Sequence, residues 1–129
     1  MNSIHLNKTD DTPEVIFDAD KQLFSIKGKS LPENAMEFYK PLYDWIVEYS
    51  KTNLNNGITL HIDLEYLNSS SIKLVFLIFS KIDEYYSLTS NKSSTNINWF
   101  YKKDDELTKI KGEEFKDLLK TPFNLIVKD

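Results

Sequence analysis

Three consecutive serines, Ser69, Ser70 and Ser71, are the residues of this sequence whose type and position suggest the most specific chemistry. They follow Asn68, where a strand-like alternation of apolar residues gives way to a helical spacing, so we expect them in the first turn of a helix. The amides of a first turn have no acceptor within the helix, and an Asn or Ser side chain can cap them. The same amides and the helix dipole favour a phosphate group. From the residues alone, a capping role and a phosphorylation site both remain open.

Residues that could bind a metal ion or transfer protons are few. The two histidines, His5 and His61, have no partners at ligand spacing, and His61 falls on the polar side of an expected strand. The acidic run Asp104, Asp105 and Glu106 could bind a divalent cation, but such a run is more typical of a helix N-terminus. We therefore expect no metal site, no cofactor and no catalytic residue.

The composition argues against several classes of protein. The 129 residues include no cysteine, so disulfides, thiolate metal sites and cysteine nucleophiles are excluded. Three glycines are too few for a phosphate-binding loop or a dinucleotide-binding motif. The net charge of -4, with lysines interleaved among acids, argues against nucleic acid as a partner. No stretch approaches the ~20 apolar residues of a membrane span, so we expect a cytoplasmic protein without a membrane partner.

The elements that position the serines follow from the spacing of apolar residues. Strands alternating with helices imply an α/β fold in which a mixed sheet is flanked by helices. We expect a single domain over residues 1–129, with residues 1–11 loosely ordered. The expected order is β-β-α-β-α-β-α-β, with strands over residues 14–18, 23–27, 58–64, 97–101 and 122–127, and helices that begin near residues 35, 69 and 104.

Several single residues refine this scheme. The strict alternation over residues 58–64 predicts a strand at the centre of the sheet. Gly28 is expected to end the second strand, and Pro41 to kink or restart the first helix because proline lacks an amide donor. Trp45 and Trp99 are expected to pack in the core and not to line a pocket.

Two separated motifs resemble those of the SiaC family of biofilm-regulating phosphoproteins. The first is the strand-to-helix segment 60–73, in which Tyr66, an apolar residue and Asn68 precede the serines and Lys73 follows. The second runs from Gly28 to Trp45, and residues 12–15 and 99–101 agree as well. The family is related in architecture to STAS domains, the anti-sigma-factor antagonists, so the resemblance implies a single STAS-like domain.

The resemblance also implies a regulatory cycle. In the family, a partner kinase phosphorylates a threonine of the serine-rich motif and a PP2C-type phosphatase removes the phosphate. The unphosphorylated form binds and stimulates a diguanylate cyclase. Ser69 occupies the threonine position here, with Ser70 and Ser71 as alternative acceptors, and Leu31 stands where the family often has tyrosine.

A partner is expected to cover the start of the second helix, so the predicted docking residues fall into two patches. The first patch is Asn68, Ser69, Ser70 and Lys73; the second, chosen from the upstream motif, is Pro32, Glu33 and Asn34.

Two other functions are considered. One is an antagonist of an anti-sigma factor, for which the STAS-like element order would suffice. The other is a hydrolase using His61, Asp63 and the serines, which lacks a glycine-rich oxyanion loop and an arranged base.

Overall fold

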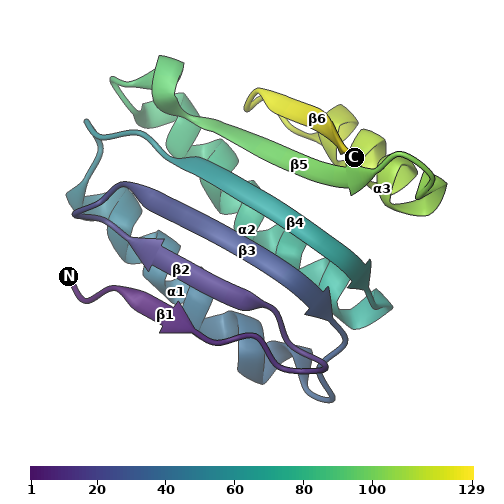
Figure 1. The fold of residues 1–129 in the computed structure, drawn as a ribbon. Helices are drawn as coiled ribbons and strands as arrows, with labels where there is room; N and C mark the ends of the chain where they lie inside the picture. Colours follow the sequence, from purple (N-terminus) through teal and green to yellow (C-terminus); the bar gives the residue numbers. More distant parts are fainter.

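Six strands form one mixed sheet whose spatial order follows the chain, β1-β2-β3-β4-β5-β6 (Figure 1). The computed structural model describes residues 1–129. β1, β2 and β3 are antiparallel neighbours, whereas β3, β4, β5 and β6 run parallel to one another. The strands are β1 Ile4–Leu6, β2 Glu14–Asp18, β3 Leu23–Ser30, β4 Thr59–Leu67, β5 Asn96–Lys102 and β6 Phe123–Lys128.

Three helices connect the parallel strands. α1 (Ala35–Thr52) leads from β3 to β4, α2 (Ser69–Leu88) from β4 to β5, and α3 (Glu106–Leu118) from β5 to β6; a short 3-10 turn, η1 (Lys92–Ser94), precedes β5. Because such crossovers are right-handed and each one advances by one strand in the same direction, the helices are expected on one face. Figure 1 shows them together behind the sheet, whose other face is open. The predicted α/β fold is confirmed.

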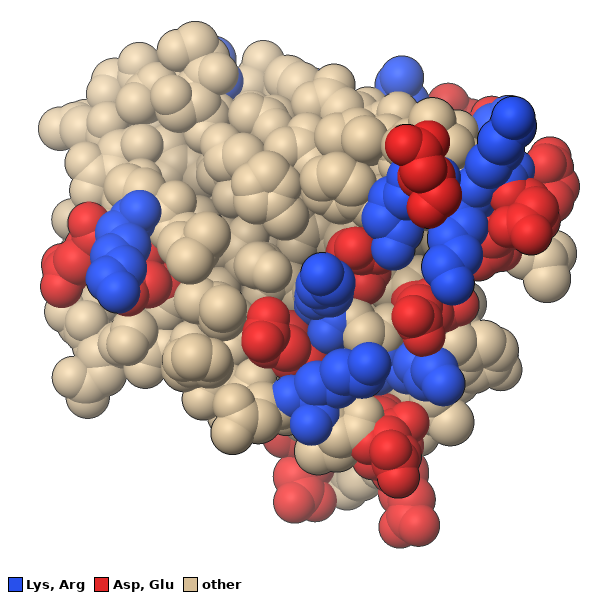
Figure 2. Space-filling view, viewed as in Figure 1, with Lys and Arg blue, Asp and Glu red and all other residues tan.

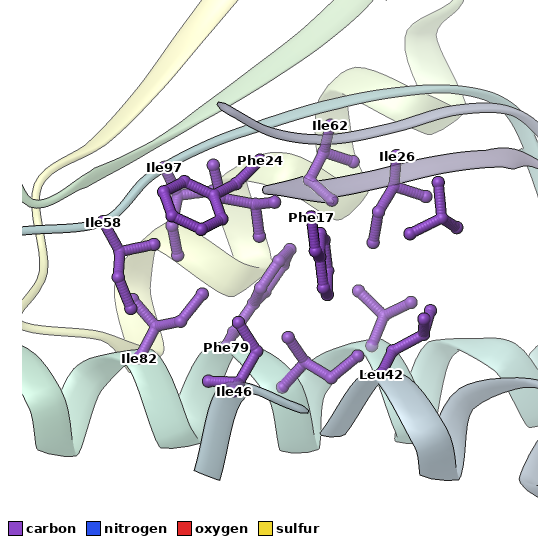
Figure 3. Packing of buried hydrophobic residues seen from close by; sticks show 14 of the residues in the cluster. Phe17, Phe24, Ile26, Leu42, Ile46, Ile58, Ile62, Phe79, Ile82 and Ile97 are labelled. Atoms are coloured by element: carbon purple, nitrogen blue, oxygen red, sulfur yellow. The ribbon is translucent and has the colours of Figure 1, made fainter. Parts of the chain in front are cut away.

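The core lies between the sheet and the helices. The alternation in β4 shows how the core forms. Leu60, Ile62 and Leu64 are buried, whereas the residues between them, His61 and Asp63, point to the open face. In Figure 3, apolar side chains of the sheet point toward those of α1 and α2. Burial of each large apolar side chain stabilises the fold by roughly 1.5–3 kcal/mol. The residues labelled there are Phe17, Phe24, Ile26, Ile58, Ile62 and Ile97, facing Leu42, Ile46, Phe79 and Ile82.

Part of the N-terminal segment is ordered, which the sequence did not predict. Residues 1–11 were expected to be loose, but Ile4–Leu6 forms β1 and pairs with β2, with Ile4 opposite Phe17. The indole of Trp45 also donates a hydrogen bond to the carbonyl of Asn2 at 2.7 Å. A strand of three residues is too short to show an alternating pattern, so the contacts with β2 and α1 determine it.

The expected end of β3 at Gly28 and the expected restart of α1 at Pro41 are absent. β3 continues to Ser30 through a bulge between Gly28 and Lys29, where Gly28 has a φ of 133°. α1 runs unbroken through Pro41, which lies on its exposed side. The opposite side of α1 packs into the core, and this packing keeps the segments before and after Pro41 in one helix.

The sheet brings two helix N-termini to one edge. β4 is central, as predicted, and pairs in parallel with β3, so the carboxyl ends of both strands lie side by side. Ser30 at the end of β3 is paired with Leu67 at the end of β4. α1 and α2 therefore both begin near this edge, where the serines lie.

Candidate functional site

Asn68 caps α2, and the serines follow it inside the helix. Its Oδ1 accepts hydrogen bonds from the Ser71 amide at 3.0 Å and from the Ser70 hydroxyl at 3.3 Å. The Ile72 amide donates to the Asn68 carbonyl at 3.0 Å and begins the helical ladder. The capping role thus belongs to Asn68, and the amides of Ser69 and Ser70 remain without an acceptor inside the helix.

The three serines differ in exposure. Ser69 and Ser70 are exposed, whereas Ser71 is completely buried. The Ser71 hydroxyl accepts a hydrogen bond from the Ser30 hydroxyl at 2.9 Å, and Ser30 in turn bonds to the Tyr39 hydroxyl. Only Ser69 and Ser70 present a hydroxyl at the surface.

The buried hydroxyl of Tyr39 remains protonated. Burial raises the pKa of Tyr39 to about 12, although its hydrogen bond with Ser30 acts in the opposite direction. The three hydroxyls are therefore neutral at physiological pH, and their contacts need no counter-ion.

Backbone contacts join the starts of the two helices. The Asn68 amide donates to the Ser30 carbonyl at 2.9 Å. Ser30 is followed by the loop that ends at Asn34, whose side chain caps α1 by accepting a hydrogen bond from the Glu37 amide at 3.1 Å. α1 and α2 each begin with an asparagine cap. Ser30, at the end of the strand that leads to α1, holds the cap of α2 in place.

The second predicted patch is only partly exposed. Glu33 and Asn34 lie at the surface, while Pro32 is buried. All three border a groove of about 610 Å³ between the loop, β1 and α1. The sequence did not indicate this groove, because one of its walls is the short strand β1. Its other lining residues include Ile4, Leu6, Phe38 and Pro41.

A second groove, of about 300 Å³, separates α1 from α2. Its apolar lining includes Met36, Tyr43, Leu74 and Leu77, of which Met36 and Leu77 are about half exposed. Three- and four-residue spacing puts Ser70 on the same side of α2 as Leu74 and Leu77. The exposed serine turn therefore adjoins an apolar surface.

The charge near the serines favours an added anion. Lys73 is exposed and lies four residues after Ser69, so it faces the same side of α2. No acidic residue occurs in the first turn of this helix. A phosphate on Ser69 or Ser70 would meet unpaired amides, the positive end of the helix dipole and a lysine.

The residues of the hydrolase hypothesis are not brought together. His61 and Asp63 lie on the open face of β4, while the serines begin a helix on the opposite face. The ring Nδ1 of His61 is 3.3 Å from the side-chain nitrogen of Asn98, and Asp63 is ion-paired with Lys128 at 2.6 Å. Neither His61 nor Asp63 is placed to act as a general base for the serines.

The remaining candidates have structural roles. Asp105 caps α3 by accepting hydrogen bonds from the Thr108 amide at 3.1 Å and from its hydroxyl at 2.7 Å. No group of three His, Asp or Glu side chains is arranged to hold a metal ion. Trp45 and Trp99 are buried and belong to the core, as predicted.

The open face of the sheet carries a mixed charge pattern. Figure 2 shows acidic and basic side chains interleaved over the half where β3 and β4 end, and a largely uncharged surface over the half where β4 and β5 begin. This face has no extended field of one sign. None of the helices combines the length and apolar character that crossing a membrane requires.

Comparisons with known proteins match nearly the whole chain. A family model described as "SiaC family regulatory phosphoprotein" matches residues 6–128. An uncharacterized protein of Pseudomonas aeruginosa strain UCBPP-PA14 is 27% identical over 129 residues, covering 100% of this chain and 99% of the relative.

Solved structures show the same fold. SiaC of Pseudomonas aeruginosa superposes with a TM-score of 0.87 at 25% identity, covering 99% of this chain and 100% of that one. A structure of the diguanylate cyclase SiaD in complex with its activator SiaC, from the same organism, contains a chain with a TM-score of 0.87 at 26% identity, covering 97% and 99%.

Proposed function

Because the chain belongs to the SiaC family of regulatory phosphoproteins, we propose that it is a non-enzymatic activator of a diguanylate cyclase, controlled by phosphorylation at the start of α2. The Pseudomonas aeruginosa SiaC with the same fold is an activator in complex with a diguanylate cyclase. The observation that carries the proposal is the capped first turn of α2, where two serine hydroxyls are exposed beside unpaired amides.

Ser69 is the proposed acceptor and Ser70 its alternative. A phosphate adds about -1.5 to -2 charges at neutral pH. At Ser69 this charge lies next to the helix N-terminus and one turn before Lys73, so the fold tolerates it. The first docking patch, by contrast, changes from the positive charge of Lys73 to a net negative charge.

The docking surface is proposed to include both patches at the carboxyl edge of the sheet. Asn68, Ser69, Ser70 and Lys73 form the first, and the exposed Glu33 and Asn34, with Pro32 beneath them, form the second. Unmodified, this surface binds the cyclase. Phosphate blocks that complex by placing charge in it, and a PP2C-type phosphatase restores binding.

The proposed phosphorylation is a cytoplasmic reaction. The test is to incubate the protein with the cognate kinase and ATP and to map the phosphate by fragment mass analysis. We expect one phosphate, on Ser69 or Ser70, and its loss in Ser69→Ala if Ser69 is the acceptor. Ser87→Ala is the matched control, since Ser87 is exposed at the other end of the same helix. Phosphate found only outside Ser69 and Ser70 would refute the site.

The partner is tested separately by co-purification. We expect the unphosphorylated protein to recover a partner with a diguanylate cyclase domain, and the phosphorylated protein to lose it. Recovery of an anti-sigma kinase in place of the cyclase would favour the antagonist function that a STAS-like fold also permits.

A further inference from the structure

A buried cluster of three hydroxyls lies directly beneath the proposed phosphorylation site. Ser30 ends β3, Tyr39 lies near the start of α1, and Ser71 lies in the first turn of α2. Ser30 and Ser71 are completely buried and Tyr39 is 1% exposed. The Ser30 hydroxyl is the centre of the cluster, because it bonds to both other hydroxyls.

Burial makes these contacts selective for one arrangement of the turn. A hydroxyl removed from water is costly unless it is paired, and no buried side-chain nitrogen or oxygen of this protein lacks a partner. If Ser71 turned outward, Ser30 would lose one of its two partners inside the core. The contact with Ser30 therefore holds Ser71 inward.

The orientation of Ser71 determines the orientation of its two neighbours. Successive residues of an α-helix lie about 100° apart around the axis. With Ser71 directed into the core, Ser70 lies about 100° away and Ser69 about 200° away, on the surface. This matches their exposure, since both are exposed and Ser71 is not.

We infer that Ser30 is a specificity-determining residue for phosphorylation: its hydroxyl holds Ser71 in the core, so that of three consecutive serines only Ser69 and Ser70 can reach a kinase. The kinase part of this inference rests on the proposed function. The positioning part stands on the geometry of the cluster and is measurable without a kinase.

The first measurement is hydrogen exchange of the Ser71 and Ile72 amides, which donate to Asn68. In Ser30→Ala, we expect these amides to exchange about fivefold faster, because one buried hydrogen bond that orders the turn is gone. Ser71→Ala removes the same bond from the other side and should have a similar effect. Ser25→Ala is the control, because Ser25 lies on the same strand, half-buried on the face away from the cluster.

The second measurement is the distribution of phosphate after kinase treatment. We expect phosphate at Ser69 or Ser70 only in the parent and in Ser25→Ala, and an additional fraction at Ser71 in Ser30→Ala. Unchanged exchange in both Ser30→Ala and Ser71→Ala, or equal phosphate distributions in the parent and Ser30→Ala, would overturn the inference. A kinase that modifies none of these proteins would contradict the proposed function, and the exchange result would still decide the positioning role.

Discussion

The carbonyl oxygen of Ser30 accepts a hydrogen bond from the Asn68 amide at 2.9 Å, so the last residue of β3 holds the residue that caps α2. Together with the buried contact between the Ser30 and Ser71 hydroxyls, this bond fixes the proposed phosphorylation turn from two sides. A phosphate added there is expected to change binding without unfolding the turn, and the predictions below separate these two effects.

A carboxylate that mimics the phosphate should affect stability and binding in opposite directions. Ser69→Glu places an acid at the N-terminus of α2, which should raise the free energy of unfolding by up to about 1 kcal/mol. It should lower the affinity for the cyclase at least about tenfold, because it puts charge into the docking surface. Urea unfolding and titration calorimetry measure the two effects.

The control for this prediction is Ser87→Glu, with the same change near the C-terminus of α2. There the acid opposes the helix dipole, so stability should fall slightly while affinity stays unchanged. Equal losses of affinity in both variants would show that added charge acts non-specifically.

The cap of α2 should contribute measurably to stability. Asn68→Ala removes the acceptor of the Ser71 amide and should lower the free energy of unfolding by about 1 kcal/mol. Asn68→Asp keeps an acceptor at this position and should retain most of the stability. Chemical denaturation of both variants tests the assignment, which would fail if alanine and aspartate were equivalent.

The second docking patch is best tested through Glu33 and not through Asn34. Asn34 caps α1, so Asn34→Ala should cost about 1 kcal/mol of stability and would confuse a binding measurement. Glu33 is exposed and makes no ion pair. We expect Glu33→Lys to unfold like the parent, within about 0.5 kcal/mol, and to bind the cyclase more weakly. Unchanged affinity would remove this patch from the interface.

A methyl group at Gly112 should destabilise α3, although alanine is the better helix former. A Cβ there would lie 2.5 Å from Cδ1 of Trp99 and 2.7 Å from Cδ2 of Leu125, both in the layer beneath the helix. Overpacking of this kind costs about 1–3 kcal/mol, more than the gain of up to about 1 kcal/mol in helix propensity. Thermal unfolding of Gly112→Ala should show the loss, and Glu113→Ala, at an exposed neighbouring position, should not.

Alkaline pH should destabilise the protein through Tyr39. Its pKa is raised from 10.0 in the unfolded chain to about 12 in the fold, so the unfolded state ionises first. The contribution of Tyr39 to the free energy of unfolding is complete below pH 10.0. It is lost as the pH rises to about 12, with a slope of up to about 1.4 kcal/mol per pH unit. Tyr39→Phe should have a shallower alkaline slope in urea unfolding. Tyr49, whose pKa burial also raises, should keep part of the slope, and identical slopes in parent and variant would contradict the assignment.

The sequence predicted the elements whose pattern is local. The alternation in β4 and the change of spacing after Asn68 placed a central strand and a helix that begins at the serines, as the structure confirms. The same pattern did not show that Ser71 is buried, because this depends on Ser30 and Tyr39 from other elements.

The local pattern also did not predict the short strand β1, or the continuation of β3 past Gly28 and of α1 through Pro41. β1 has only three residues and owes its order to its pairing with β2. Strand pairing likewise carries β3 past Gly28 through a bulge, and core packing carries α1 through Pro41. In each case a tertiary contact outweighs a local preference.

The bond between Ser30 and Ser71 joins residues 41 positions apart in the chain. In an unfolded chain or a short peptide all three serine hydroxyls face water, and Ser71 becomes inaccessible only when β3, α1 and α2 have assembled. The difference in accessibility among the three serines is thereby a property of the fold and not of the local sequence.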